Sequence, residues 1–283
     1  MLKHLIRNRI LASFLCAITA FSINAEYKTA SDISYSSNTD AYSRQRCRLD
    51  VYYNDSIAGA PVVVWFHGGG LVGGNRYIPK ALKEQGYVVV APNYRFLTGA
   101  ALADCIDDAA AAVAWTFANI GDYGGDARSI FVSGHSAGGY LTSMVGLQKS
   151  WLAKYGVEAD SIAGLFPFSG QAVTHFEHRK RNGGSELRPT IDETAPLYHV
   201  RPDAPPYIIV SGDREMELFG RYEENAYMWR MMKLVGHPDV RIYELDGYGH
   251  VEMAVPAFHI MKQNIGRILR RRDAKSTEKL PHD

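Results

Sequence analysis

Segment 131–141 reads FVSGHSAGGYL and places Ser136 among glycines and an alanine. Gly134 and Gly138 flank Ser136 in the pattern G-x-S-x-G, with strand-forming residues before it and a helix-compatible run after it. At a sharp strand-to-helix turn, side chains two positions before and after the serine would collide, which accounts for the two glycines. The pattern therefore predicts a nucleophilic hydroxyl, lifted above the edge of a sheet at the start of a helix.

A second glycine-rich stretch, WFHGGG at 65–70, ends an apolar run upstream of the serine. A serine nucleophile needs hydrogen-bond donors for the negative charge that develops on the oxygen of the attacked carbonyl. Glycines allow backbone N–H groups to face that oxygen. We therefore expect the N–H groups of Gly69, Gly70 and Ala137 to form an oxyanion hole.

A nucleophilic serine also needs a general base, and here we expect the base to follow the serine in the chain. His250 lies in LDGYGHVEM, a glycine-containing loop directly after the last apolar run. His237 fits less well because it stands beside Pro238 between a helix and a strand, and His259 because it lies in the C-terminal helical segment. His250 is therefore the expected base.

The acid that orients the base is less sharply defined. The run IVSGDREMEL contains Asp213, Glu215 and Glu217 just after an apolar strand pattern. A common spacing places the acid three residues after a glycine, and counting from Gly212 gives Glu215, whose side chain can accept the imidazole N–H. We expect Glu215 to be the acid, with Asp213 as the alternative because it lies nearer the end of the strand.

Apolar runs and helical patterns alternate along the chain. Continuous β-branched runs such as PVVVWFH predict strands that are covered on both faces. Strand, helix, strand at this spacing predicts the α/β class, with a mostly parallel central sheet and helices on both faces. The expected strands are 48–53, 61–67, 87–95, 129–135, 162–169, 207–213 and 241–247, and the expected helices are 77–86, 107–121, 220–236 and 254–272.

Both ends of the chain and one internal segment differ in composition from the rest. Residues 1–25 combine a basic start with a short apolar run, which predicts a secretory signal cleaved after Ala25; a retained membrane anchor is the alternative. We expect the mature chain to be exported, to the periplasm or the medium, as a single domain over 26–272 with a flexible tail at 273–283. Segment 171–203 is polar and basic, and predicts either a lid or cap over the site or a solvated insertion.

Composition argues against several other classes of protein. The 31 basic and 30 acidic side chains give a net charge of +1, so no overall field favours nucleic acid or an anionic membrane, and a small molecule is the expected partner. The histidines are scattered and form no metal-binding motif. In an oxidising compartment Cys47 and Cys105 could form a disulfide or remain buried thiols, and the sequence leaves both open.

Taken together, these motifs resemble the α/β-hydrolase superfamily, and within it the esterases that carry HGGG and G-x-S-x-G. The chain is similar to an exported, BD-FAE-like subgroup related to feruloyl and acetylxylan esterases. Leu71 stands where many relatives have a tryptophan. The resemblance runs from about Arg48 to Ile268 and rests on HGGGLVGGN (67–75), APNYR (91–95), YGGDARSIFVSGHSAGGYL (123–141) and GRYEENAYM (220–228).

The resemblance implies a serine esterase that needs no cofactor and keeps no stable membrane association once the signal is removed. Ser136 would attack a small ester, such as an acetyl or feruloyl ester of a carbohydrate, while His250 takes and returns its proton through an acyl-enzyme. Leu71 and Gln171 are expected to line the substrate pocket. The alternatives are an amidase such as an arylformamidase, which would use the same residues, and a non-catalytic binding protein. The sequence leaves the oligomeric state open.

Overall fold

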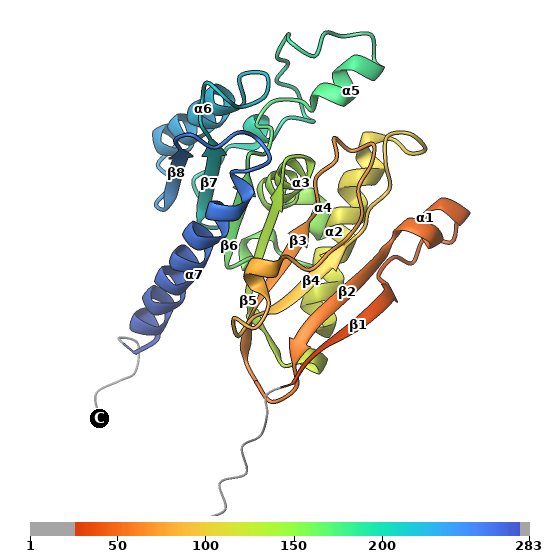
Figure 1. Cartoon of the computed structure of the whole chain (residues 1–283), viewed down its shortest axis with the longest axis vertical. Helices are drawn as coiled ribbons and strands as arrows, with labels where there is room; N and C mark the ends of the chain where they lie inside the picture. The colour runs from red at the N-terminus through yellow and green to blue at the C-terminus, as the bar shows by residue number, and fades with distance from the viewer. Residues whose placement is uncertain (1–25, 278–283) are drawn as a thin grey trace, which may run out of the picture.

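The computed structural model describes residues 26–277, which are built around an eight-stranded sheet (Figure 1). The strand order is β1-β2-β4-β3-β5-β6-β7-β8; β2 runs antiparallel to both its neighbours, and all later pairs are parallel. The expected mostly parallel α/β sheet is therefore confirmed. The strands are β1 (Tyr27–Ser34), β2 (Arg48–Asn54), β3 (Ala60–Phe66), β4 (Val88–Pro92), β5 (Gly125–His135), β6 (Gly164–Phe168), β7 (Tyr207–Gly212) and β8 (Val240–Leu245).

Strand β3 shows why the central strands are continuous apolar runs. Val62, Val64 and Phe66 belong to the apolar core on one face of the sheet. Val63 and Trp65 belong to the core on the other face. Side chains alternate between the two faces of a strand, so a strand covered on both faces needs an apolar residue at every position.

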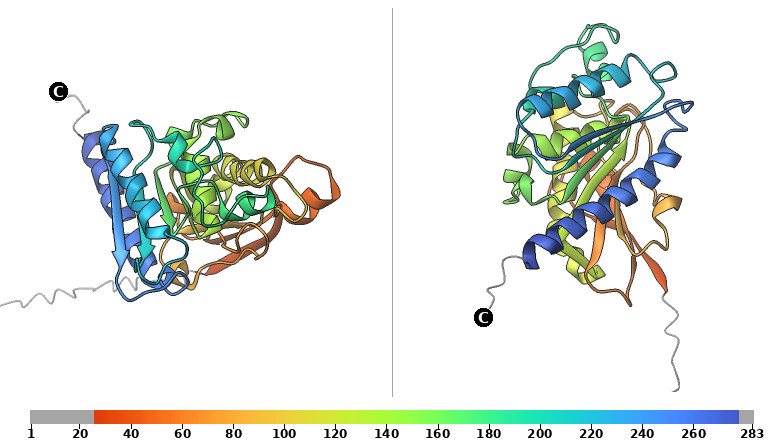
Figure 2. Two further views of the ribbon diagram at one scale, coloured as in Figure 1. Left: turned by 90° about the horizontal axis from the view of Figure 1, so that it is seen from above. Right: turned by 90° about the vertical axis from the view of Figure 1, so that its left-hand side faces the viewer.

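Helices cover the two faces of the sheet unequally (Figure 2). α2, α3 and α6 supply the larger core, whereas α7 and the short turn η1 supply the smaller one. The helices are α1 (Ala41–Arg46), α2 (Leu102–Asn119), α3 (Ala137–Leu147), α4 (Ser150–Ala153), α5 (Phe176–Arg181), α6 (Arg221–Leu234) and α7 (Ala254–Thr277), and the 3-10 turns are η1 (Lys80–Leu82), η2 (Ile120–Tyr123), η3 (Ala159–Ser161) and η4 (Pro196–His199).

Three stretches differ from the expectation. The predicted helix at 77–86 is wrong: only the turn η1 forms, because Glu84 and Gly86 have left-handed backbone, with φ of 57° and 76°, which an α-helix cannot contain. The polar stretch 27–46 contains β1 and α1, which the sequence pattern does not reveal, because β1 pairs with β2 alone and keeps most side chains exposed. Helix α7 continues to Thr277, beyond the predicted boundary at 272.

Segment 171–203, called here the cap segment, is folded onto the domain and carries α5 and η4. The Tyr140 hydroxyl on α3 donates to the carbonyl oxygen of Thr194 at 2.6 Å. Within the segment the Thr174 N–H donates to the Thr190 carbonyl at 2.9 Å. In Figure 1 α5 lies at the opposite end of the molecule from the last turns of α7. The cap segment is therefore an ordered part of the domain.

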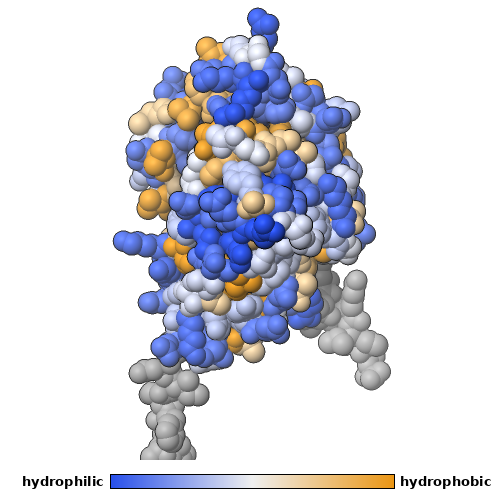
Figure 3. Space-filling view, turned by 90° about the vertical axis from the view of Figure 1, so that its right-hand side faces the viewer, coloured by the Kyte–Doolittle hydropathy of each residue, from blue (hydrophilic) through white to orange (hydrophobic). Residues whose placement is uncertain are grey.

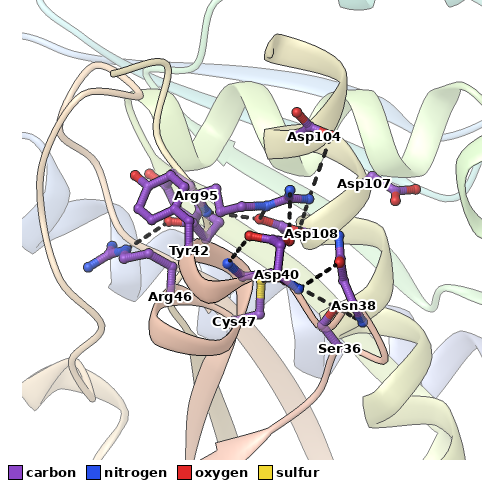
Figure 4. A network of polar contacts seen from close by, with 12 residues as sticks. Ser36, Asn38, Asp40, Tyr42, Arg46, Cys47, Arg95, Asp104, Asp107 and Asp108 are labelled. Atoms are coloured by element: carbon purple, nitrogen blue, oxygen red, sulfur yellow. Dashed lines mark hydrogen bonds and ion pairs between the residues drawn. The ribbon is translucent and has the colours of Figure 1, made fainter. Parts of the chain in front are cut away.

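A buried ion pair ties the loop after β4 to α2 (Figure 4). Arg95 Nε and Nη2 each donate to Asp108 at 2.8 Å, and the Arg95 backbone N–H donates to the same carboxylate at 2.9 Å. Both side chains are buried. Asp40 and Asp104 lie farther from the guanidinium, at 3.9 and 3.7 Å. The pair fixes the path of the chain that leaves β4 in the APNYR motif.

Cys47 and Cys105 are free, buried thiols and do not form a disulfide. Burial raises the pKa of Cys47 to about 11 and that of Cys105 to about 12. Both therefore remain protonated at neutral pH, as inert thiols do.

Nothing in residues 26–277 forms a helix that is long and apolar enough to cross a membrane. The predicted signal at 1–25 and its cleavage after Ala25 lie outside the described residues, so export stays a prediction.

Asp108→Ala is expected to lower the free energy of unfolding by about 3–5 kcal/mol, because it leaves the Arg95 guanidinium buried without its bidentate partner. Urea denaturation followed by circular dichroism measures the loss. The control is Asp107→Ala, one residue earlier on α2. The Asp107 carboxylate pairs with Lys154 at the surface, and the loss of this exposed ion pair should cost at most about 1 kcal/mol of unfolding free energy. Equal losses in the two variants would contradict a special contribution of the buried pair.

Candidate active site

Ser136 lies in the turn between β5 and α3, with φ 56° and ψ −117°. This backbone conformation is rare for a residue with a side chain and costs free energy that its surroundings must offset. A Cβ on Gly138 would lie 2.1 Å from the carbonyl oxygen of Phe66, and one on Gly134 would lie 2.5 Å from the backbone of Gly138. Both flanking positions therefore require glycine, and the structure has the strand-turn-helix geometry that the pattern predicts.

The imidazole of His250 joins Ser136 to a carboxylate. His250 Nε2 lies 2.9 Å from Ser136 Oγ, and His250 Nδ1 lies 2.8 Å from Glu217 Oε2. Because a carboxylate only accepts hydrogen bonds, these partners assign the hydrogen to Nδ1 and leave Nε2 to accept from the serine hydroxyl. The side chain of Glu217 is only 1% exposed, so this carboxylate is shielded from solvent.

The expected acid, Glu215, does not reach His250, and neither does the alternative, Asp213. The Asp213 carboxylate is turned toward the backbone, where it accepts the N–H groups of Glu215 and Gly247. Glu215 and Asp213 do not contact the imidazole, whereas Glu217 does. The prediction of the acid is therefore wrong by two residues.

A single turn of backbone explains why the acid is Glu217 and not Glu215. The Asp213 carbonyl accepts the N–H groups of Met216 and Glu217, each at 2.9 Å, so the chain closes one helix-like turn directly after β7. Such a turn carries a residue four positions on back toward the strand end, where the Gly212 N–H donates to Glu217 Oε1 at 2.8 Å. The sequence signal that could have identified Glu217 is Asp213, a residue type that favours the start of a turn, followed by an acid four residues later.

Glu217 stays ionised through the neutral range. Burial alone raises its pKa, but hydrogen bonds from His250, Ser169 and the Gly212 N–H outweigh burial and lower the pKa to about 2. A buried carboxylate that is stabilised in its charged form can hold a positively charged imidazole.

Ser169, directly after β6, is a fourth polar side chain that the sequence analysis did not find. Its Oγ donates to Glu217 Oε1 and lies 3.0 Å from His250 Nδ1. Ser169 has a φ of 46°, a second left-handed residue with a side chain at this site. A polar residue just beyond the end of a central parallel strand was the available signal.

The start of α6 supports Ser169 and explains the motif GRYEENAYM. The buried Arg221 donates from Nη1 to the carbonyl of Ser169 and from Nε to Glu224. Glu224 in turn accepts the backbone N–H groups of Ala172 and Val173, at 3.1 and 3.0 Å. Burial raises the pKa of Glu224, although Arg221 acts in the opposite direction. This buried pair fixes the chain between β6 and the cap segment.

His135, at the first unspecified position of G-x-S-x-G, also reaches the base. Its Nε2 lies 2.7 Å from the carbonyl oxygen of His250, and the two rings are 4.9 Å apart. Burial and the neighbouring His250 lower the pKa of His135 to about 4. The neutral ring therefore donates from Nε2 and ties the loop of the base to the nucleophile turn. The G-x-S-x-G pattern allows any residue at this position, so sequence reasoning could not single out His135.

The glycine loop of HGGG lies against the nucleophile. A Cβ on Gly68 would be 3.4 Å from Ser136 Cβ and 3.2 Å from the carbonyl of His135. Gly69 and Gly70 have φ of 116° and 64°. The Gly69 carbonyl accepts the N–H groups of Val72 and Gly73, at 3.0 and 3.1 Å, and these two bonds close the loop. The Gly69 carbonyl is thus used within the loop, and the assignment of the N–H groups of Gly69, Gly70 and Ala137 to an oxyanion hole stays a prediction.

His67 and the APNYR motif hold that loop in place. The Tyr94 hydroxyl donates to the His67 carbonyl at 2.7 Å, and the two rings stack 4.5 Å apart. Arg46 donates to the Gly74 carbonyl at 3.2 Å, and its guanidinium lies 4.1 Å from the centre of the Phe96 ring. Burial lowers the pKa of His67 to about 4, so its ring is neutral at neutral pH.

Of the two expected substrate-binding residues, Leu71 is buried in the core and Gln171 lines a cavity. Leu71 is completely buried in the core, with a φ of 61°, and presents no accessible surface to a ligand. The expectation that it lines the pocket is therefore not met. Gln171 lies at the wall of a cavity beside the cap segment.

In the part of the chain that the structure describes, no cluster of three or more His, Cys, Asp or Glu side chains could hold a metal ion.

Comparison with known proteins agrees with this fold. Residues 49–163 match the family model BD-FAE. The chain is 27% identical over 214 residues to esterase LipC of Mycobacterium tuberculosis, an alignment that covers 68% of this chain and 53% of LipC. It is 29% identical over 217 residues to the probable carboxylic ester hydrolase LipM of the same organism, covering 67% of this chain and 49% of LipM. The chain thus spans about half the length of these curated relatives.

Solved structures extend the likeness to most of the chain. A truncated carbohydrate esterase from gut microbiota superimposes with a TM-score of 0.70 at 15% identity, covering 85% of this chain and 96% of that one. Esterase B from Lactobacillus rhamnosis gives a TM-score of 0.71 at 19% identity, covering 89% of each chain. The fold is therefore that of the α/β-hydrolases. Within that fold, residues 49–163 are similar to the BD-FAE family.

The pKa of His67 predicts that acid destabilises the fold. An unfolded histidine has a pKa near 6.5, and the folded value is about 4, so the unfolded chain binds the proton more readily. The associated stability is complete above about pH 6.5 and is lost as the pH falls toward 4; for this residue it is on the order of 3 kcal/mol. Urea denaturation at several pH values measures the slope.

His67→Asn is expected to reduce this slope, because the variant has no imidazole to protonate. His259→Asn is the control and should keep the wild-type slope, since this ring is exposed on α7. A His67→Asn slope equal to that of the wild type would contradict the assignment.

Proposed function

We propose that this protein is a serine carboxylic ester hydrolase that works through an acyl-enzyme. The observation that carries the proposal is the continuous chain of contacts from Ser136 Oγ to His250 Nε2 at 2.9 Å and from His250 Nδ1 to Glu217 Oε2 at 2.8 Å. This is the geometry of nucleophile, base and orienting acid. The similarity to LipC and LipM, whose names describe ester hydrolysis, supports it.

In the first half of the reaction Ser136 Oγ attacks the carbonyl carbon of the ester. His250 Nε2 takes the hydroxyl proton, and the imidazolium is stabilised by Glu217, which is already ionised. The negative charge that forms on the carbonyl oxygen is held by the N–H groups of Gly69, Gly70 and Ala137. His250 then protonates the leaving alcohol, and the acyl group stays on Ser136.

In the second half a water molecule replaces the alcohol. His250 takes a proton from the water, which attacks the acyl-enzyme, and the same N–H groups hold the second oxyanion. The proton then passes from His250 back to Ser136 Oγ as the carboxylic acid leaves. Both half-reactions need the Nδ1–H tautomer, which Glu217 and Ser169 hold from the other side of the ring.

Ser136→Ala and Glu217→Gln are expected to lose most of their activity on 4-nitrophenyl butyrate. In a well-studied serine enzyme, removing the nucleophile lowers kcat about a millionfold and removing the acid lowers it roughly ten-thousandfold. Steady-state release of 4-nitrophenol measures both effects.

Glu215→Gln is the matched control, because it makes the same chemical change two residues away on a side chain that does not contact His250. It is expected to keep wild-type kcat within about twofold. Full activity of Ser136→Ala would refute a serine mechanism. Hydrolysis of formanilides but of no ester by the wild type would favour an amidase, such as an arylformamidase, over the esterase.

Ser169→Ala tests the fourth polar side chain as a positioning residue. Alanine at φ 46° is strained as serine is, so the variant isolates the loss of Oγ. A hydrogen bond to a charged group is worth about 1.5–3 kcal/mol, so kcat should fall about tenfold to a hundredfold while KM stays unchanged.

The control is Ser133→Ala, which removes another buried hydroxyl, one that donates to the Phe166 carbonyl at 2.8 Å and does not contact the triad. It should keep kcat within about threefold. A loss of kcat in Ser133→Ala as large as in Ser169→Ala would show that the effect is general destabilisation.

A further inference from the structure

A cavity of about 420 Å³ lies between the cap segment and the start of α6. Its volume falls in the range of ligand pockets. Apolar side chains form much of its wall, among them Val173, Leu187, Ile191, Phe219 and Tyr227. Four of these five are also substantially exposed to solvent, with Leu187 at 70%. Exposed apolar groups gathered around one cavity indicate a binding surface.

Two aromatic rings connect this cavity to the glycine loop. The end of the Phe176 ring lies 3.7 Å from where a Cβ on Gly70 would be. The Phe176 ring is 5.7 Å from that of Phe219, which lines the cavity and stands two residues after Glu217. The cavity is therefore adjacent to the place where the ester carbonyl would bind.

Three of the four charged side chains at the cavity are occupied by other protein groups. Arg179 donates to three carbonyls of the cap segment itself. Glu224 is held by Arg221 and by two backbone N–H groups. Glu186 pairs with Lys180 at 3.8 Å. Glu223 is exposed to solvent.

The basic run 179–181 does not offer a site for an acidic sugar. Arg179 is committed as described, Lys180 pairs with Glu186, and Arg181 lies 3.3 Å from Glu177. These contacts neutralise the cluster locally, so it exerts little attraction on an anionic ligand.

The loops that carry the triad add further exposed apolar side chains. Met216 and Leu218 flank Glu217, and Tyr248 and Val251 lie beside His250. Met216 Cε is 3.9 Å from where a Cβ on Gly249 would be, so the acid loop and the base loop meet here. These four residues are called the apolar rim. Figure 3 shows hydrophobic residues mainly in the upper part of one face, toward the end of the molecule where α5 lies.

We infer that the cavity binds an apolar group of several carbons in the substrate ester, next to the apolar rim on the loops of Glu217 and His250. This rests on the proposed function and names the substrate class of that site: esters with an aliphatic or aryl chain rather than acetyl esters of a polar carbohydrate. Transfer of such a chain from water to this wall is favourable in proportion to the apolar area buried.

The test compares kcat/KM for 4-nitrophenyl acetate, butyrate and octanoate, and for ethyl and octyl acetate, in the wild type, Leu187→Ser and Ile191→Ser. The wild type is expected to prefer the long-chain member of at least one series. In both variants the ratio of long-chain to short-chain kcat/KM should fall about tenfold, the effect of weakening one apolar contact. A fall for octanoate assigns the cavity to the acyl group, and a fall for octyl acetate assigns it to the alcohol.

Leu234→Ser is the matched control, since it also replaces an exposed apolar side chain, at the far end of α6. It should leave every ratio within about twofold. Wild-type preference for acetate in both series would overturn the inference, as would ratios in Leu187→Ser and Ile191→Ser that stay at the wild-type value. These results leave the esterase proposal intact, because that proposal fails only if Ser136→Ala retains activity or the wild type hydrolyses no ester.

Discussion

The site depends on one close approach, that of the first turn of α3 to the end of β3. At Gly138 the backbone of α3 lies so near the Phe66 carbonyl that no side chain fits between them. This approach forces the chain through a left-handed residue at Ser136, which points the hydroxyl away from the sheet. Because the glycine loop begins directly after Phe66, the same contact also brings this loop next to Ser136.

The base and the acid come from two other loops, which hydrogen bonds connect to the rest of the site. His135 ties the base loop to the nucleophile turn, and Ser169 ties the acid to the base. Ser169 is in turn supported by the buried pair of Arg221 and Glu224. A buried ion pair is weak evidence for stability, and here its geometry suits a different task, which is to fix the direction of backbone groups.

Sequence reasoning identified the sheet, the nucleophile turn and the base loop, because each has a signal of fixed spacing. Gly134 and Gly138 are required by steric contact, and the buried strands are required to be apolar at every position. The acid was misplaced because its position depends on the number of residues in one turn after β7, which no hydrophobic pattern encodes. Ser169 was missed because its role arises only from contacts across three separate loops.

The two buried cysteines of the described residues have a consequence for how the protein can be handled. Cys47 and Cys105 make no covalent cross-link, so the native fold needs no oxidant and is compatible with reducing and oxidising surroundings alike. Their sulfur atoms lie in the core, and their raised pKa values keep them protonated. A water-soluble alkylating reagent therefore reaches them only when the chain opens. The rate of alkylation therefore measures how often the core opens on the side of the sheet that holds α2.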